Sequence, residues 1–231
     1  MKRRMCILAI LLFSFSVYGQ QNIGVKVNGG LSGIFIYDNS TQQIKQKSYF
    51  VASGQGGLLY NLSLGNKSLF GAEFLFIQIE GKGRSEIPFT DQNGNPTGEY
   101  GVDNFFTHIT YVGLPIYYGF KIKKLTLNLG AQTAYAIASG GREKGQAADG
   151  YGGITTWDNK FDKLNIDAFD FGARVGLIFN LTNRFAIEGT YYYGISNILK
   201  KNVNNSELKW KIQQITIGLH YTFFTINKKE I

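Results

Sequence analysis

The segment from Gln213 to Phe224 alternates strictly between apolar and polar or small residues, and this alternation constrains the fold more than any other feature. Ile215, Ile217, Leu219 and Tyr221 share one face, and the residues between them share the other. A period of two residues is typical of a β-strand with one apolar and one polar face. The pattern recurs about eight times along the chain, and no helices are evident that could cover the apolar faces. It therefore favours a closed barrel whose apolar face meets lipid.

The spacing of these segments predicts eight strands and the way they are connected. The expected strands cover residues 22–36, 50–65, 68–83, 105–122, 125–139, 166–181, 185–196 and 213–224. The connections between them alternate long and short, as in transmembrane barrels with long extracellular loops and short periplasmic turns. We therefore expect an all-β fold, an eight-stranded antiparallel up-and-down transmembrane barrel whose last strand pairs with the first. The alternative is a lipocalin-like soluble barrel, in which the apolar residues would face the interior.

The N-terminus has the features of a cleaved signal peptide. Lys2, Arg3 and Arg4 precede an apolar stretch over residues 7–15, and small residues follow it. The apolar stretch is too short to span about 30 Å of hydrocarbon as a helix. We therefore expect residues 1–19 to be removed, with cleavage near residues 19–21. Residues 20–231 would then form one barrel domain in the outer membrane of a Gram-negative cell.

Composition excludes several kinds of chemistry. Cys6 is the only cysteine, and it lies in the expected signal peptide, so the mature chain would have no disulfide and no thiolate metal site. The 29 glycines and the 15% of aromatic residues are typical of short alternating barrel strands. Residues 91–95 resemble part of a calcium-binding loop but lack the acidic residue at its twelfth position. We expect neither a cofactor nor a metal ion.

The side chains that face the interior include charges of both signs. An eight-stranded barrel is barely wide enough for its own side chains to fill, and buried charges are tolerated when they are paired. We predict a polar network that closes the lumen, and a narrow ion path is the alternative. The residues of this network are Lys26, Glu73, Lys121, Asp170, Arg174, Glu188 and His220.

The two histidines are the remaining candidates for catalysis. We expect His220 to be a hydrogen-bonded side chain of the lumen. His108 lies at the level where lipid-modifying barrels act, but a nucleophilic mechanism would also need a serine and a carboxylate beside it. Thr110 shares its face, and no serine does. We therefore expect a non-enzymatic protein, and a lipid-modifying outer-membrane enzyme is the alternative.

The longest segments without apolar alternation are residues 84–104 and 140–165. Loops of this length are usually functional or disordered, and a rigid barrel can present them as a binding surface. Tyr151 and Trp157 are candidate contacts for a protein or ligand there. The other expected partners are outer-membrane lipid and lipopolysaccharide. We expect no nucleic-acid partner and a monomeric, structural or surface-binding protein.

Four segments resemble a known family. Residues 24–32, residues 71–76 with their inward Glu73, residues 111–116 and residues 192–198 are similar to segments of PorT-like outer-membrane β-barrel proteins. Gly113 stands where that family usually has an inward glutamate. The resemblance covers nearly all of the expected mature chain and implies the same barrel fold. Because the namesake of the family is linked to a protein-secretion apparatus, it also implies an accessory role in secretion as an alternative function.

Overall fold

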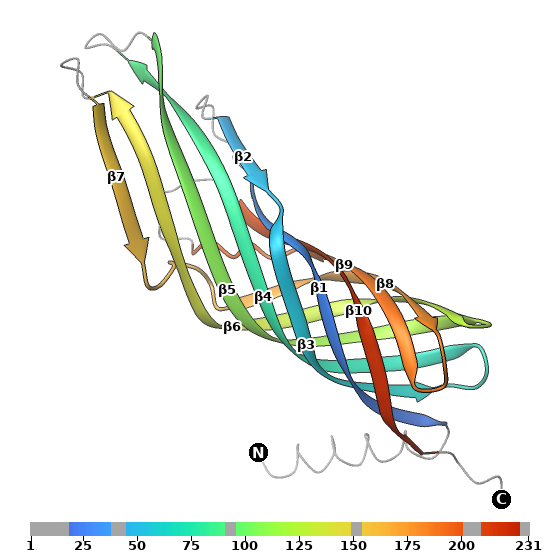
Figure 1. Ribbon diagram of the computed structural model, residues 1–231. Coiled ribbons are helices and arrows are strands. Elements are labelled where there is room, and N and C mark those ends of the chain that lie inside the picture. Colours follow the sequence, from blue (N-terminus) through green and yellow to red (C-terminus); the bar gives the residue numbers. More distant parts are fainter. Residues whose placement is uncertain (1–18, 38–44, 91–95, 149–153, 201–208, 227–231) are drawn as a thin grey trace, which may run out of the picture.

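The computed structural model describes residues 19–37, 45–90, 96–148, 154–200 and 209–226 (Figure 1). Most of the expected signal peptide therefore lies outside the described residues. The described part of the chain contains ten β-strands, and no helix in it is long and apolar enough to cross a membrane. The strands are β1 (Gln21–Tyr37), β2 (Lys45–Tyr49), β3 (Val51–Ser63), β4 (Ser68–Thr90), β5 (Pro96–Ile122), β6 (Leu125–Ala148), β7 (Ile154–Phe161), β8 (Phe169–Asn180), β9 (Phe185–Gly194) and β10 (Lys209–Ile226).

Eight of these strands close into an antiparallel barrel. Each of β1, β3, β4, β5, β6, β8, β9 and β10 pairs with two neighbours in the wall. The expected pairing of the last strand with the first is confirmed, with Gln21 opposite Ile226 at one end and Tyr37 opposite Lys209 at the other. Closure leaves the barrel wall without a free edge.

The expectation that residues 84–104 and 140–165 are loops is largely wrong. The ladder between β4 and β5 continues past Glu86, which lies opposite Val102. β6 continues to Ala148, and β7 pairs with its last residues. Apolar alternation marks only strands that turn one face towards a protein core or towards membrane lipid. A strand with both faces in water is specified by its hydrogen-bonded neighbours, and sequence alternation does not reveal it.

Two short strands, β2 and β7, pair with the long strands β4 and β6 beyond the points where β3 and β8 end their pairing with them. The pairing of β3 with β4 ends at Gly54 opposite Gln78, and β2 takes the same side of β4 from Tyr49 opposite Lys82. In the same way β7 replaces β8 beside β6. The result is a five-stranded sheet of residues 45–49, 80–90, 96–108, 140–148 and 154–161, here called the extension. Figure 1 shows it at the upper left, at the end of the barrel opposite Gln21 and Ile226.

The outer face of the barrel is apolar and the inner face is largely polar. Val27, Leu129 and Ile217 are 71%, 67% and 66% exposed, whereas Lys26, Asn128 and Thr216 are buried. This arrangement is the reverse of a soluble barrel, so the lipocalin-like alternative is wrong. The strand register also places exposed aromatic residues at two levels. Phe185 packs against Tyr221 with tilted rings and 4.9 Å between ring centroids near the short turns, and Tyr135 lies opposite Phe169 towards the extension. Such aromatic girdles are typical of the two membrane interfaces.

Candidate functional site

Four buried charged side chains meet inside the barrel. Lys26 on β1, Glu73 on β4, Arg174 on β8 and Glu188 on β9 all belong to the inward set of their strands and are at most 4% exposed. They come from four different strands, because each strand contributes only every second residue to the lumen. We call these four residues the charge cluster.

Every cation of the charge cluster contacts both carboxylates. Arg174 Nη1 donates to Glu73 Oε2 at 2.7 Å, and its Nη2 donates to Glu188 Oε1 at 3.0 Å. Lys26 Nζ lies 3.1 Å from Glu73 Oε2 and also forms an ion pair with Glu188. The two positive and two negative charges balance within the cluster. Such pairing is what makes buried charges tolerable, because each charge has lost its water.

Polar side chains around the charge cluster satisfy its remaining hydrogen-bonding capacity. His220 Nε2 lies 2.8 Å from Glu188 Oε2, and Asn28 Nδ2 donates to the same oxygen at 3.2 Å. The guanidinium of Arg174 lies over the ring of Tyr117, 5.5 Å from its centroid. The ring of His220 is therefore held by a carboxylate within the buried network.

The structure places Lys121 and Asp170 apart from the charge cluster. Lys121 Nζ donates to Ser63 Oγ at 2.7 Å near the short turns. Asp170 lies nearer the extension, where it accepts hydrogen bonds from Tyr192 at 2.7 Å and from Ser196. The seven residues predicted to line the lumen are therefore distributed over three levels. Parity along a strand predicts which side chains point inward but not at which height they meet.

An apolar layer lies in the lumen between the charge cluster and the extension, and sequence reasoning missed it. Leu75, Ile77 and Ile109 face inward and are at most 1% exposed. The segments before β8 and after β9 add Ile166 and Ile198, which belong to the same buried cluster. Gly113 makes room here, because a Cβ at this position would lie 2.5 Å from the Ile77 side chain. The sequence feature that could have predicted this layer is the presence of isoleucines at inward positions of β4 and β5.

His108 lies on the outer face of the sheet, where the barrel meets the extension. It is exposed, sits opposite Glu80 in the strand register, and lines a hollow of 360 Å³ together with Arg142 and Asp162. Neither a serine nor a cysteine lines this hollow, and no hydrogen bond joins the His108 side chain to another described residue. Within the described ranges no three His, Cys, Asp or Glu side chains are placed to hold a metal ion.

Trp157 lies in a strand and not in a loop as expected. It sits in β7 opposite Gly145, and its ring occupies the space that a side chain at Gly145 would need. The Trp157 side chain also hydrogen-bonds Glu143, whose pKa is raised by burial and by the neighbouring Asp103. The ring is therefore part of the packing of the extension. Tyr151 lies outside the described residues.

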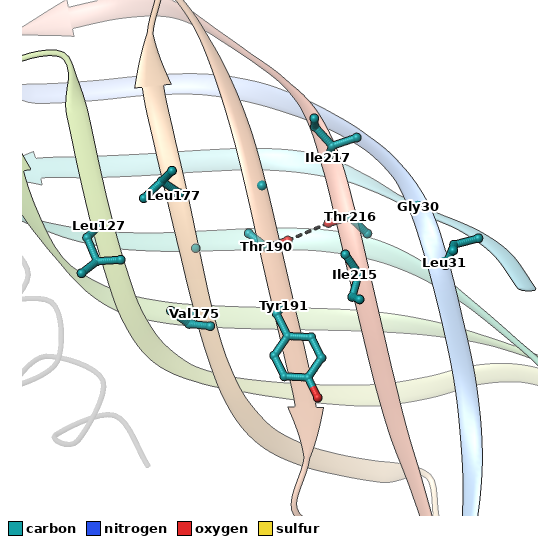
Figure 2. A pocket seen from close by; sticks show the side chains of 12 residues that line it. Gly30, Leu31, Leu127, Val175, Leu177, Thr190, Tyr191, Ile215, Thr216 and Ile217 are labelled. Atoms are coloured by element: carbon teal, nitrogen blue, oxygen red, sulfur yellow. Dashed lines mark hydrogen bonds between the residues drawn. The ribbon is translucent and has the colours of Figure 1, made fainter. Parts of the chain in front are cut away.

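The outer wall contains a shallow apolar recess of 630 Å³. Figure 2 shows Leu177, Tyr191 and Ile217 around it, and the missing side chain of Gly189 leaves the space open. Behind the recess the hydroxyls of Thr190 and Thr216 are 2.6 Å apart and bond to each other inside the wall. The exposed lining of the recess is almost entirely apolar, and it is continuous with the lipid-facing surface.

A closed barrel with an apolar exterior and a buried charge cluster is the architecture of an outer-membrane β-barrel. The family model for the outer membrane protein beta-barrel domain matches residues 18–200. The chain belongs to this family, and its place is the outer membrane of a Gram-negative cell. None of the curated proteins matches it.

Several solved structures are similar in fold. Ail of Yersinia pestis, crystallised with the heparin analogue sucrose octasulfate, is 14% identical with a TM-score of 0.39, covering 89% of this chain and 99% of Ail. Neisserial surface protein A is 11% identical with a TM-score of 0.41 and the same two coverages of 89% and 99%. OprG of Pseudomonas aeruginosa is 11% identical with a TM-score of 0.38, covering 89% of this chain and 96% of OprG.

Proposed function

We propose that this chain is a non-enzymatic outer-membrane protein whose barrel is a closed anchor and whose extension binds a partner at the cell surface. The observation that carries the proposal is strand length. β4, β5 and β6 contain 23, 27 and 24 residues, whereas β8 and β9 contain 12 and 10. A strand needs only about 9–11 residues to cross the hydrocarbon. The surplus in three adjacent strands builds a sheet outside it.

The short turns indicate that this sheet faces the cell exterior. The connections from β3 to β4, from β5 to β6 and from β8 to β9 all lie at the end opposite the extension. Short turns of transmembrane barrels lie on the periplasmic side. β4 continues roughly 12 residues past Gln78, which corresponds to ~40 Å of strand beyond the last barrel pairing of β3.

The extension presents a polar outer face that is held in place by ion pairs. Asp158 on β7 accepts two hydrogen bonds from Arg142 on β6, at 2.6 and 2.5 Å, and Lys144 Nζ lies 3.0 Å from the same carboxylate. These contacts lower the pKa of Asp158. Lys82 and Arg84 on β4 are exposed in the same sheet. A rigid, charged and water-exposed sheet suits a polar protein or glycan partner better than an apolar one.

Three finer assignments belong to this proposal. Residues 1–19 act as a cleaved signal peptide. The chain is a PorT-like member of its family, which rests on residues 24–32 and 192–198. The protein works as a monomer in contact with lipid and lipopolysaccharide, without a cofactor. An accessory role in secretion is the alternative that this resemblance supports, and it would use the same anchor.

The binding role is tested by shortening the extension at two paired positions. Residues 83–105 and 142–160 are each replaced by Gly-Asn, which joins Lys82 to Phe106 and Gly141 to Phe161, residues that are already strand partners. Cell-surface crosslinking is then compared between the intact and shortened proteins. We expect the shortened barrel to insert and to lose its partners. Capture of the same partners by the shortened barrel would overturn the proposal.

The non-enzymatic role is tested separately. Lipid A is analysed by mass spectrometry from cells with the protein, without it, and with His108→Ala. We expect three identical spectra, because neither a serine nor a cysteine lines the hollow beside His108. A change in acyl chains that depends on the protein and disappears in His108→Ala would favour the lipid-modifying alternative.

A further inference from the structure

The lumen opens at the end opposite the extension into a polar vestibule of 490 Å³. Its wall is formed by the first and last residues of the barrel strands and by two of the short turns. Among the described residues, the charged or titratable side chains that line it are Lys121, Lys123, Lys124, Arg184 and His220, and no described aspartate or glutamate lines it. The vestibule is separated from the extension by the charge cluster and the apolar layer.

The vestibule cations differ from the other basic residues inside the barrel, because no acidic residue in the described part of the chain pairs with them. Lys26 and Arg174 pair with Glu73 and Glu188. By contrast, Lys121, Lys123, Lys124 and Arg184 form no ion pair with any residue that the structure describes. Lys121 is the strongest evidence among them, since its half-buried side chain lines the vestibule and, among the described side chains, hydrogen-bonds the hydroxyl of Ser63, at 2.7 Å.

The two turns that carry the cations are ordered and tied together. Asn180 donates hydrogen bonds to the Lys124 carbonyl from its backbone, at 2.8 Å, and from its side chain, at 3.3 Å. Thr182 Oγ1 accepts from the backbone of Arg184 at 3.1 Å, which closes the second turn. Lys123 adopts a φ of 55°, a left-handed conformation that glycine or asparagine adopts at lower cost. The lysine therefore stands where turn geometry alone would favour another residue.

We propose that this vestibule is a binding site for a phosphate group on the periplasmic side of the barrel. Several cations without a carboxylate create a positive potential in a concave site, and a doubly charged phosphate has enough oxygens to accept from several of them at once. Hydroxyls and amides of the lining, such as Thr126 and Asn61, are uncharged donors for the remaining oxygens. The volume also admits the group that carries the phosphate. That group is either a phospholipid headgroup of the inner leaflet or a soluble phosphate ester, and both would be recognised by the same chemistry.

The site is tested with the mature protein refolded in dodecyl maltoside, a detergent without phosphate. Glycerol phosphate is titrated by calorimetry into the unmodified protein, Lys121→Met/Arg184→Met and the control Lys67→Met. Lys67 is an exposed turn lysine at the same end that does not line the vestibule. We expect the double variant to bind about tenfold more weakly or worse, as for lost hydrogen bonds to a charged group. The control should match the unmodified protein.

Native mass spectrometry of protein extracted from membranes distinguishes the two sources. Retention of a phospholipid by the unmodified protein and by Lys67→Met, but not by the double variant, identifies a lipid headgroup. Binding of glycerol phosphate without retained phospholipid identifies a soluble ester. Arg184→Met alone, a substitution in an exposed turn, provides the same comparison if the double variant does not fold. If neither ligand binds, or if both bind all variants equally, the proposal is wrong.

Discussion

Arg174 Nη1 lies 2.7 Å from Glu73 Oε2, although the two residues are 101 positions apart and lie on β8 and β4, which are not neighbours in the barrel. The bond therefore crosses the lumen. Arg174 also reaches Glu188 on the adjacent strand, at 3.0 Å. One guanidinium thus joins three strands of the wall, and its planar fork suits two carboxylates better than a lysine would.

Removing Arg174 should destabilise the barrel strongly. Arg174→Met leaves Lys26 as the one remaining cation of the charge cluster for Glu73 and Glu188, and breaking a buried ion pair by deleting one partner costs about 3–5 kcal/mol. The free energy of unfolding, measured by urea titration of the protein in lipid vesicles, should fall by this amount. Arg84→Met, an exposed control on the extension, should change it by at most about 0.5 kcal/mol. An equal change in the free energy of unfolding for both substitutions would contradict a stabilising role of the charge cluster.

The lumen should not conduct ions like a porin. The charge cluster and the apolar layer of Leu75, Ile77 and Ile109 occupy it at two successive levels, and the inward side chains of these layers are almost fully buried. Planar-bilayer recordings of purified protein should show no steady conductance of porin size. A stable large conductance from the monomer would mean that these layers do not close the path.

Two glycines on the barrel should respond in opposite ways to alanine. A Cβ at Gly71 would overlap the ring of Tyr117, which packs under Arg174, whereas a Cβ at Gly189 would meet nothing within 4 Å. Gly71→Ala should therefore lower the free energy of unfolding by about 1–3 kcal/mol, as for an overpacked core. Gly189→Ala should be neutral or stabilise by about 0.4–1 kcal/mol, because it restricts the unfolded chain. Urea titration measures both, and a reversed order would contradict the described packing.

The stability of the extension should depend on pH through Glu143. Burial and Asp103 raise the pKa of Glu143 in the folded protein, so the folded state binds this proton more tightly than the unfolded state. The contribution of Glu143 to stability is therefore greatest at acid pH and is lost as pH rises through the raised pKa. Glu143→Gln should remove this part of the pH dependence.

Hydrogen exchange of the amides in β6 and β7, corrected for intrinsic rates, measures the effect. The difference in protection between the unmodified protein and Glu143→Gln should change sign or shrink between neutral pH and pH near the ordinary carboxyl pKa. The pKa of Asp158 is lowered in the folded protein, so its contribution to stability is lost as pH falls, which is the opposite pH dependence. Asp158→Asn is therefore the matched control. A constant difference between the unmodified protein and Glu143→Gln over this range would show that Glu143 keeps the same charge in both states.

The barrel itself could be predicted from the sequence because its physical cause is local. Alternation along one strand shows which side chains face lipid, as in the strand that contains Ile217, and the spacing of the alternating segments predicts the number of wall strands. The inward orientation of Lys26, Glu73, Arg174 and Glu188 follows from the same alternation. In the structure Lys26, Glu73, Asp170, Arg174, Glu188 and His220 are buried, and Lys121 is half-buried.

Only the tertiary structure decided which inward residues meet and where the sheet continues past the membrane. The height of a side chain depends on the stagger between neighbouring strands, which no single strand encodes, so Asp170 and Lys121 could not be separated from the charge cluster in advance. Trp157 was expected in a loop because the strands of the extension are rich in polar residues and glycine and lack apolar alternation. In the extension, hydrogen bonds to the neighbouring strand specify the conformation, and no continuous apolar face does.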